Sequence, residues 1–141
     1  MSELLELHGV IEAPPDEVAK ILLDVRPGGR SPIATRGQVA ETDPGDDFVV
    51  VQDGSRMTVS VDRAGRSVAL QGEWWYRGVT SVEPDPRGSR VVHRIFNVAP
   101  GHGWAVRFAA RGPLNSAPRT FAEMVHGLGE LLGVAAWVVD E

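Results

Sequence analysis

Apolar and polar side chains alternate near the start of the chain. Leu5, Leu7, Gly9 and Ile11 alternate with Glu6, His8, Val10 and Glu12, which is the two-residue period of a strand with one buried face. An Ala-Pro-Pro-Asp-Glu sequence at 13–17 then favours a helix start, because proline is tolerated in a first turn and acids suit the helix dipole. Pro-Gly-Gly at 27–29 ends this helix. Its apolar stripe recurs at helical spacing, at Val18, Ile21, Leu22 and Val25.

A run of short alternating segments separated by turn sequences follows. The turn sequences are Asp-Pro-Gly-Asp, Asp-Gly, Arg-Ala-Gly-Arg and Asp-Pro-Arg-Gly, all typical of tight connections. Parallel neighbours would need crossovers of about a dozen residues, so these short connections predict an antiparallel meander. The predicted strands are 38–41, 48–52, 57–61, 67–70, 73–83 and 90–98.

The last third of the chain returns to helical spacing. Residues 104–110 are apolar and predict an opening helical segment, which Gly112-Pro113 interrupts. Gly127 and Gly129 lie inside a longer helix that ends at Gly133, and each costs about 1 kcal/mol relative to alanine. They either let the helix approach a sheet or leave room for a bound molecule. After Pro118 the apolar stripe of this helix is Phe121, Met124, Val125, Leu128, Leu131 and Leu132.

The order of these elements predicts the architecture. A sheet with one apolar face must be covered, and the C-terminal helix is the only predicted element long enough to do so. We therefore expect an α+β fold, a curved antiparallel sheet of about seven strands wrapped around a long C-terminal helix. One or two short helices follow the first strand, the second of them within 30–36. No repeat or linker divides the chain, so residues 1–141 are expected to form a single domain.

Three stretches of the chain carry a family resemblance. Residues 10–18 (VIEAPPDEV) are similar to a first strand, proline-containing turn and first helix, and 78–84 (GVTSVEP) with 88–91 (GSRV) to a penultimate hairpin. With the helix after Pro118, they resemble the SRPBCC superfamily of helix-grip proteins, which includes START-type lipid carriers and polyketide cyclase/dehydrase-like proteins. Ser89 stands where that superfamily usually has threonine. The resemblance implies a helix-grip fold with a cavity for small molecules, but no universal catalytic residue.

Composition narrows the possible chemistry. Cysteine is absent, which excludes disulfides, thiolate metal sites and cysteine nucleophiles. The only lysine, Lys20, follows no glycine-rich phosphate loop, and the chain has no Gly-x-Ser-x-Gly motif. Four histidines without His-x-x-x-His spacing predict no metal site, and we expect no cofactor. These histidines are His8, His93, His102 and His126.

Charge and hydropathy bear on the partners and the cellular location of the protein. Asp and Glu outnumber Lys and Arg by 19 to 14, a net charge of −5, which argues against a nucleic-acid partner. Residues 1–11 have no basic segment and contain acids, unlike a signal peptide. The longest apolar stretch, 134–139, is far shorter than the roughly 20 residues of a membrane helix. We expect a cytoplasmic protein with no integral membrane association.

An aromatic cluster at 74–76 (Trp-Trp-Tyr) suggests where a ligand would lie. On strand 73–83, Arg77, Ser81 and Glu83 share the face of Trp75, so we place that face outward. The inward residues are either plain core or the lining of a cavity, where amphipathic rings suit a flat, partly polar ligand. The predicted inward set is Trp74, Tyr76, Gly78, Thr80 and Val82.

Both faces of strand 90–98 mix apolar and polar residues, so periodicity does not choose between them. If Val82 pairs with Val91, a group of Tyr76, His93 and Asn97 lies in an apolar pocket, an arrangement suited to proton abstraction or aldol cyclisation and dehydration. The alternative is that the side chains of His93 and Asn97 form a hydrogen bond with each other at the exposed end of the strand. The inward set is Val91, His93, Ile95 and Asn97 in this register, but Arg94 and Phe96 in a register one residue longer.

The function expected first is binding of a hydrophobic or amphipathic small molecule, such as a lipid, polyketide-like or aromatic compound, between sheet and helix. One alternative is a cyclase/dehydratase-type enzyme without metal or nucleotide, with Tyr76, His93 and Asn97 or Arg94 as catalytic candidates. Another is a module that binds a protein partner. Inward polar groups favour the enzyme, an apolar cavity favours the carrier, and a collapsed cavity beside an exposed apolar patch favours the module. The candidate ligand-binding residues are Met57, Trp74, Tyr76, Thr80, His93, Ile95, Phe121, Met124 and Leu128.

Overall fold

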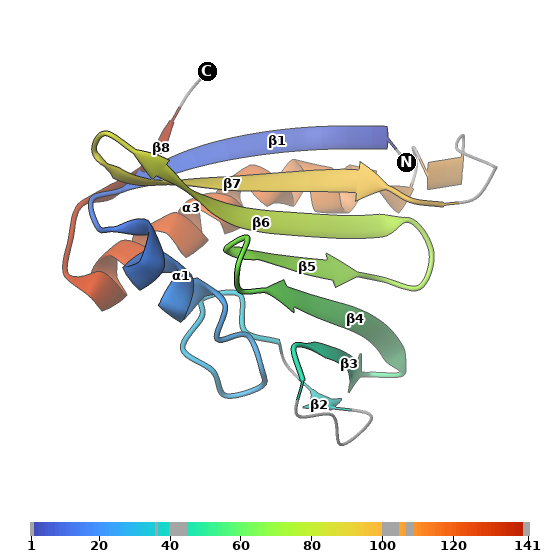
Figure 1. The fold of residues 1–141 in the computed structure, drawn as a ribbon. Helices are drawn as coiled ribbons and strands as arrows, with labels where there is room; N and C mark the ends of the chain where they lie inside the picture. Colours follow the sequence, from blue (N-terminus) through green and yellow to red (C-terminus); the bar gives the residue numbers. More distant parts are fainter. Residues whose placement is uncertain (1, 36, 40–44, 100–104, 107–108, 140–141) are drawn as a thin grey trace.

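The computed structural model describes residues 2–35, 37–39, 45–99, 105–106 and 109–139. Within them, one antiparallel sheet has eight strands in the order β2-β3-β4-β5-β6-β7-β1-β8 (Figure 1). The strands are β1 (Ser2–Ile11), β2 (Gln38–Val39), β3 (Asp47–Gln52), β4 (Ser55–Asp62), β5 (Ser67–Gln71), β6 (Tyr76–Asp85), β7 (Gly88–Asn97) and β8 (Ala136–Val139). The helices are α1 (Pro15–Leu22) and α3 (Arg111–Leu132).

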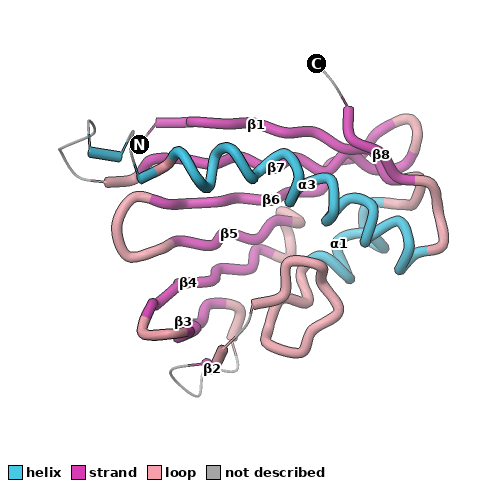
Figure 2. The backbone as a smooth tube through the Cα atoms, turned by 180° about the vertical axis from the view of Figure 1, so that it is seen from behind, coloured by secondary structure: helices cyan, strands magenta, loops and turns pink. Residues whose placement is uncertain are grey.

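Both helices lie on one face of the curved sheet. Figure 2 shows α3 running along β7 and β6, with α1 beside its C-terminal end and the loop after α1 facing β3 and β4. α3 packs on β1 and β8, and α1 packs on β6, β7 and α3. This arrangement confirms the α+β helix-grip prediction, with one strand more than expected. No helix in the described part of the chain combines the length and apolar character needed to cross a bilayer.

The pairing of β6 with β7 settles the question that periodicity left open. Val82 lies opposite Val91, and the turn closes with Asp85 opposite Gly88. This is the shorter of the two registers considered above. Thr80 is therefore opposite His93, and both lie on the face that α3 covers. Because side chains alternate along a strand, this register turns Arg94 to the other face.

The long helix begins before both prolines rather than after Pro118. Its first residue is Arg111, so Gly112 and Pro113 do not interrupt it. Pro113 lies in the first turn, where a backbone N–H has no acceptor within the helix. Pro118 removes one hydrogen bond, but Ala117 and Phe121 on either side are buried and hold the segment against the sheet.

Two further differences concern segments near the ends of the helices. Residues 31–34 form a single turn in which the N–H of Ala34 donates to the carbonyl of Ser31 at 2.9 Å, so α1 is the one short helix between β1 and β2 among the described residues. Residues 105–106 are helical as predicted, whereas 104 and 107–108 lie outside the described residues. Strand β8 was not predicted. It pairs with β1, with Val10 opposite Trp137.

Glycine allows α3 to approach the sheet closely. A Cβ atom on Gly9 of β1 would lie 2.7 Å from Cγ2 of Val125 in α3. Gly129 serves the same purpose toward β8, since its Cβ would lie 2.7 Å from that of Ala136. A Cβ atom on Gly127 would instead lie 3.4 Å from Cγ of Pro32, which is an ordinary contact distance. The close approach of α3 to the sheet therefore explains why residue 129 is a glycine. Gly9 permits the same close approach from the side of the sheet.

Candidate functional site

A cavity of about 540 Å³ lies between the sheet and the N-terminal half of α3. Its volume falls in the range of about 300–1,000 Å³ that is usual for small-molecule sites. The strands contribute Met57, Leu70, Tyr76, Thr80, His93 and Ile95. The helix contributes Pro113, Ser116, Ala117, Thr120, Phe121 and Met124, and Ile33 comes from the loop after α1.

The cavity lies where two hydrophobic clusters meet. The larger cluster joins α1, the strands and the C-terminal half of α3, and it includes Phe121 and Met124. The smaller cluster lies at the other end of the sheet, around Trp75, Ile95 and Ala117. Residues of both clusters line the cavity. Apolar residues of both clusters therefore border a space that the side chains of α3 do not fill.

Tyr76 lies back along the inner face of β6. A Cβ atom on Gly78 would lie 2.5 Å from the Tyr76 hydroxyl oxygen, so the absence of a side chain at Gly78 makes room for the phenol ring. The ring meets Trp75 edge to face, with centroids 5.5 Å apart. Burial raises the pKa of the Tyr76 hydroxyl above 10.0. Tyr76 therefore presents a neutral phenol to the cavity.

His93 is the titratable group on the β7 side of the cavity. Its Nδ1 lies 2.8 Å from Oγ1 of Thr80, in a hydrogen bond across the β6–β7 pair. The imidazole stacks on Phe121 of α3, with ring centroids 6.1 Å apart and planes inclined at 24°. Burial lowers the pKa of His93 from 6.5 to about 4. The side chain is therefore neutral at pH 7, and Nε2 is the nitrogen that remains for a molecule in the cavity.

Seven of the nine candidate ligand-binding residues line this cavity, and two do not. Leu128 is fully buried in the larger cluster, one turn beyond the cavity. Trp74 is 49% exposed, while Trp75 is 7% exposed, so the predicted faces of these two residues are wrong. The reason is that β6 begins only at Tyr76. The seven lining residues are Met57, Tyr76, Thr80, His93, Ile95, Phe121 and Met124.

A tight connection before β6 explains the error at the tryptophans. The N–H of Gly72 donates to the carbonyl of Tyr76 at 3.0 Å, and the N–H of Val98 donates to the carbonyl of Trp75 at 2.8 Å. These bonds hold the chain in a bend at 73–75. The strict alternation of strand side chains does not extend through a bend, so Trp75 turns into the smaller cluster.

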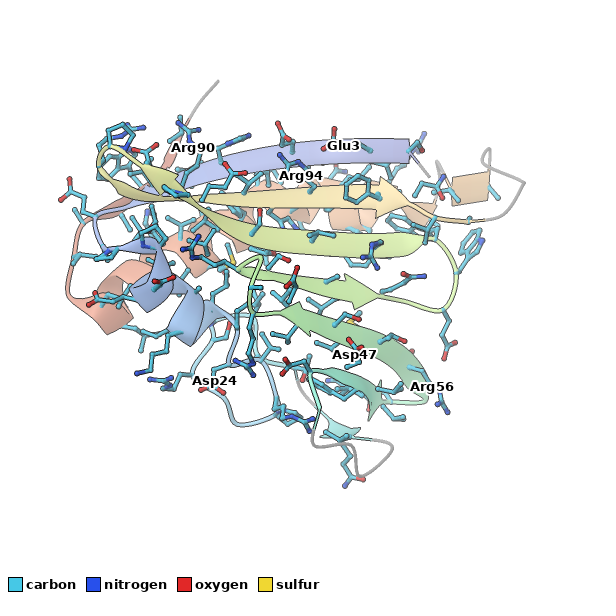
Figure 3. All side chains as sticks on the ribbon, viewed as in Figure 1. Glu3, Asp24, Asp47, Arg56, Arg90 and Arg94 are labelled. Carbon is cyan, nitrogen blue, oxygen red and sulfur yellow. The ribbon has the colours of Figure 1, made fainter. Side chains whose placement is uncertain are left out.

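Two of the four catalytic candidates lie apart from the cavity. Nε of Arg94 donates to Glu6 at 2.6 Å and lies 3.4 Å from a carboxylate oxygen of Glu3. Figure 3 shows Arg94 and Glu3 on the face of the sheet away from α3. Oδ1 of Asn97 accepts the backbone N–H of Ala99 at 3.0 Å, and Asn97 is not among the lining residues. The candidates that the fold brings together at the cavity are Tyr76 and His93.

The sequence prediction missed the residues that the helix contributes before Phe121. Ser116, Ala117 and Thr120 continue the spacing of three and four residues that Phe121 and Met124 follow. That signal was present, but the helix was predicted to begin only after Pro118. Ile33 and Leu70 had no such signal. Ile33 lies in a loop without periodicity, and only the pairing of β5 with β6 brings Leu70 to the cavity.

Among the described residues, no three His, Cys, Asp or Glu side chains gather in a way that would hold a metal ion. Of the four histidines, His102 lies outside the described residues. The ring nitrogens of His8 contact Glu6 and Arg90 on β1 and β7. His93 bonds Thr80 instead.

Comparison with known proteins finds similarity in fold only. No family model matches the chain, and no curated protein matches it by sequence. Protein CV1439 from Chromobacterium violaceum is 16% identical, with 93% of this chain and 97% of that chain covered and a TM-score of 0.51. TTHA0849 from Thermus thermophilus is 18% identical, covering 89% and 95%, with a TM-score of 0.46. Ara h 8.0201 is 16% identical, covering 92% and 98%, with a TM-score of 0.43.

At these identities a structural likeness concerns the fold alone. The match to CV1439 extends over nearly the whole of both chains. It agrees with the element order described above, in which an antiparallel sheet is covered by one long C-terminal helix. The chain therefore has a helix-grip fold with an open cavity between its sheet and that helix.

Proposed function

We propose that this protein binds a hydrophobic or amphipathic small molecule between the sheet and α3. The observation that carries the proposal is the cavity of about 540 Å³ itself. Apolar side chains from four strands, α3 and the loop after α1 border it, including Met57, Ile95 and Phe121. Removing apolar ligand surface from water into such a site is favourable by about 25 cal/mol per Å². The resemblance to the SRPBCC superfamily supports the same function.

The polar groups of the cavity favour a ligand that is uncharged where it is buried. Tyr76, whose pKa burial raises above 10.0, and His93, whose pKa burial lowers to about 4, are both neutral at pH 7. The described lining residues include no lysine, arginine, aspartate or glutamate. An unpaired charge placed in such surroundings loses its hydration without compensation. A carbonyl or hydroxyl group, in contrast, can form a hydrogen bond with His93 Nε2 or with the Tyr76 hydroxyl.

These features favour binding over the two alternatives. A general base works best when its pKa lies near the operating pH, and the pKa of His93 is about 4. Arg94 and Asn97, the other catalytic candidates, are bonded elsewhere. A module that binds a protein partner was expected to have a collapsed cavity, whereas this cavity is open.

The direct experiment is native mass spectrometry of the protein purified from its own host, followed by denaturing extraction of any bound compound. A stoichiometric apolar compound is the expected result. A second measurement uses the recombinant chain and N-phenyl-1-naphthylamine, a neutral probe whose fluorescence rises in apolar surroundings. The wild-type chain is expected to bind this probe saturably.

Two variants of α3 assign probe binding to the cavity. Ala117→Phe fills part of the space that the probe would occupy, because Ala117 lines the cavity, and we expect at least a tenfold loss of affinity. Asn115→Phe adds the same ring at an exposed position of the helix and is the matched control. Circular dichroism confirms that both variants fold. A wild-type chain without saturable binding, or equal affinities in the two variants, would contradict the proposal.

A further inference from the structure

A second hollow adjoins the cavity, and its described lining residues include none from α3. It has a volume of about 510 Å³ and lies between the loop after α1 and the β3–β4 hairpin. Three apolar residues, Ile33, Met57 and Leu70, line both spaces. The two hollows therefore meet along a shared wall of side chains.

Together the hollows follow the inner face of the sheet across five neighbouring strands. The path starts at His93 on β7 and passes Thr80 on β6, Leu70 on β5 and Met57 on β4 before it reaches Val50 on β3. Neighbouring strands are about 4.8 Å apart, so four spacings amount to roughly 19 Å. That length greatly exceeds the width of a single aromatic ring. It suits a molecule with an extended chain.

The loop that borders the outer hollow is held in place by hydrogen bonds. Both the N–H and the hydroxyl of Thr35 donate to the carbonyl of Val25, at 2.8 and 2.9 Å. The N–H groups of Ile33 and Ala34 donate to the side chain and the carbonyl of Ser31, at 3.3 and 2.9 Å. Ser31 is itself buried. Ile33 and Ala34 are thus fixed opposite the strands, where both border the outer hollow.

The chemistry of the lining changes along the path. Around the shared wall it is apolar, with Ile33, Met57 and Leu70. At the outer end, Gln52, Asp53, Ser55 and Arg56 border the hollow at the β3–β4 turn. Figure 3 labels Arg56 at the start of β4, beside this turn. Charged and hydrogen-bonding groups are therefore available at the outer mouth.

We propose that one ligand occupies both hollows. It is a long, unbranched, mainly apolar molecule whose chain passes Ile33, Met57 and Leu70 and whose polar headgroup lies at the β3–β4 turn. The inference rests on the proposed function, since it assigns the inner cavity to the same ligand. It adds a second subsite and a substrate class, the amphipathic compounds with one extended chain.

The test measures how 1-alkanols, from 1-hexanol to 1-tetradecanol, displace N-phenyl-1-naphthylamine from the chain. Each buried methylene contributes about 0.8 kcal/mol, which corresponds to about fourfold in affinity. In the wild-type chain this increase is expected to continue through the longest alcohols. Ala34→Trp places an indole in the outer hollow, because Ala34 lines that hollow and not the inner cavity. It is expected to weaken 1-tetradecanol, which needs both hollows, at least tenfold more than 1-hexanol, which is short enough to bind in the inner cavity alone.

Two further variants serve as a control for the added indole and as a milder substitution at Ala34. Thr58→Trp adds an indole to β4 at an exposed position next to Met57, where alternation directs the side chain to the other face of the sheet, and should follow the wild-type series. Ala34→Leu is a smaller obstruction for use if Ala34→Trp does not fold. If the probe binds but the alcohol series is the same in wild type and the Ala34 variants, the two-hollow inference is overturned and the proposed function stands. If the wild-type chain does not bind the probe, both fail.

Discussion

His93 shows how position in the fold decides what one side chain offers to a ligand. Its Nδ1 bonds Oγ1 of Thr80, and that bond can form in two ways. If the Thr80 hydroxyl donates, the proton of the neutral imidazole lies on Nε2, which then donates to a ligand carbonyl. If Nδ1–H donates, Nε2 is an acceptor for a ligand hydroxyl. The hydrogen bond to Thr80 therefore leaves Nε2 able either to donate to a ligand carbonyl or to accept from a ligand hydroxyl. Burial keeps the imidazole ring neutral in both cases.

Thr80→Val tests this hydrogen bond. Valine has nearly the shape of threonine, but it leaves Nδ1 of His93 without the partner it has at 2.8 Å. Thr80 is 1% exposed, so solvent cannot easily replace the hydroxyl. We expect a loss of about 1–3 kcal/mol in the free energy of unfolding, measured by urea denaturation at pH 7. Thr80→Ser keeps the hydroxyl and should lose less; an equal or greater loss in the serine variant would show that the hydroxyl is not responsible.

At the scale of elements, α3 has two different environments along its length. Its N-terminal half borders the cavity through Ala117 and Phe121. Its C-terminal half packs in the larger cluster through Val125 and Leu128. Gly133 ends the helix with a φ of 70°, a left-handed conformation that glycine adopts without strain. One helix thus anchors the core at one end and leaves the cavity open at the other.

Leu128 and Leu131 separate the buried face of α3 from its exposed face. Leu128 is 0% exposed and Leu131 is 54% exposed. Leu128→Ala should lower the free energy of unfolding by about 2–5 kcal/mol, because it removes buried apolar surface and leaves a cavity. Leu131→Ala is the matched control and should change stability by less than about 0.5 kcal/mol. Similar losses in the two variants, measured by chemical denaturation, would contradict this assignment of faces.

The close approach of α3 to β1 gives a second prediction at this scale. A Cβ on Gly9 would lie 2.7 Å from Cγ2 of Val125, so Gly9→Ala should destabilise the protein by about 1–3 kcal/mol through overpacking. Val125→Ala removes the opposing methyl groups. In a double-mutant cycle, the two substitutions together should cost less than the sum of their separate losses. Additive losses would show that the two sites do not press on one another.

A buried hydrogen bond joins the residues just before α1 to the adjacent β6–β7 hairpin. Oγ of Ser89 donates to the carbonyl of Ala13 at 2.6 Å, and Ser89 is 0% exposed. A Cβ on Gly88 would lie 2.6 Å from the carbonyl oxygen of Ile11, so the β6–β7 turn and the end of β1 are in direct contact. The first and third quarters of the chain are thereby held together.

For the whole molecule, burial of titratable groups links stability to pH. The folded protein keeps His93 neutral down to about pH 4, whereas its ordinary pKa is 6.5. Between these values the unfolded chain binds more protons than the folded one, so stability falls as the pH falls through this window. Asp85 acts at lower pH, because hydrogen bonds from Arg87 lower its pKa to about 2. Its contribution is present above its ordinary pKa of 3.8 and is lost as the pH falls through about 2.

The pH dependence is measurable with one substitution. Wild-type protein should lose more stability between pH 7 and pH 4.5 than His93→Gln, which cannot titrate at this position. The difference should approach, and not exceed, about 3 kcal/mol. Urea denaturation at the two pH values measures it. Parallel losses in both proteins would show that His93 does not contribute to the pH dependence.

The elements were largely predictable because their signals are local. Alternation around Leu7 and the turn sequences between the strands identified most of β1 and the meander, since side-chain period and turn chemistry act over a few residues. The prediction failed where a longer-range contact overrides a local signal. Pro118 is compatible with a helix once Phe121 and Ala117 pack on the sheet, and Trp75 turns inward because its carbonyl bonds the N–H of Val98.

What the sequence determined by itself was the order of elements from β1 to α3 and the antiparallel pairing of the meander, because each follows from local periodicity and connection length. The helix-grip class was implied by the family resemblance. Tertiary structure alone decided which face of β7 is inward, since Val82 can be matched to Val91 or shifted without changing either strand's pattern. It also decided that His93 is buried beside Thr80 and that Ile33 joins the two hollows. Those properties arise only when segments distant in the chain pack against one another and exclude water from the space between them.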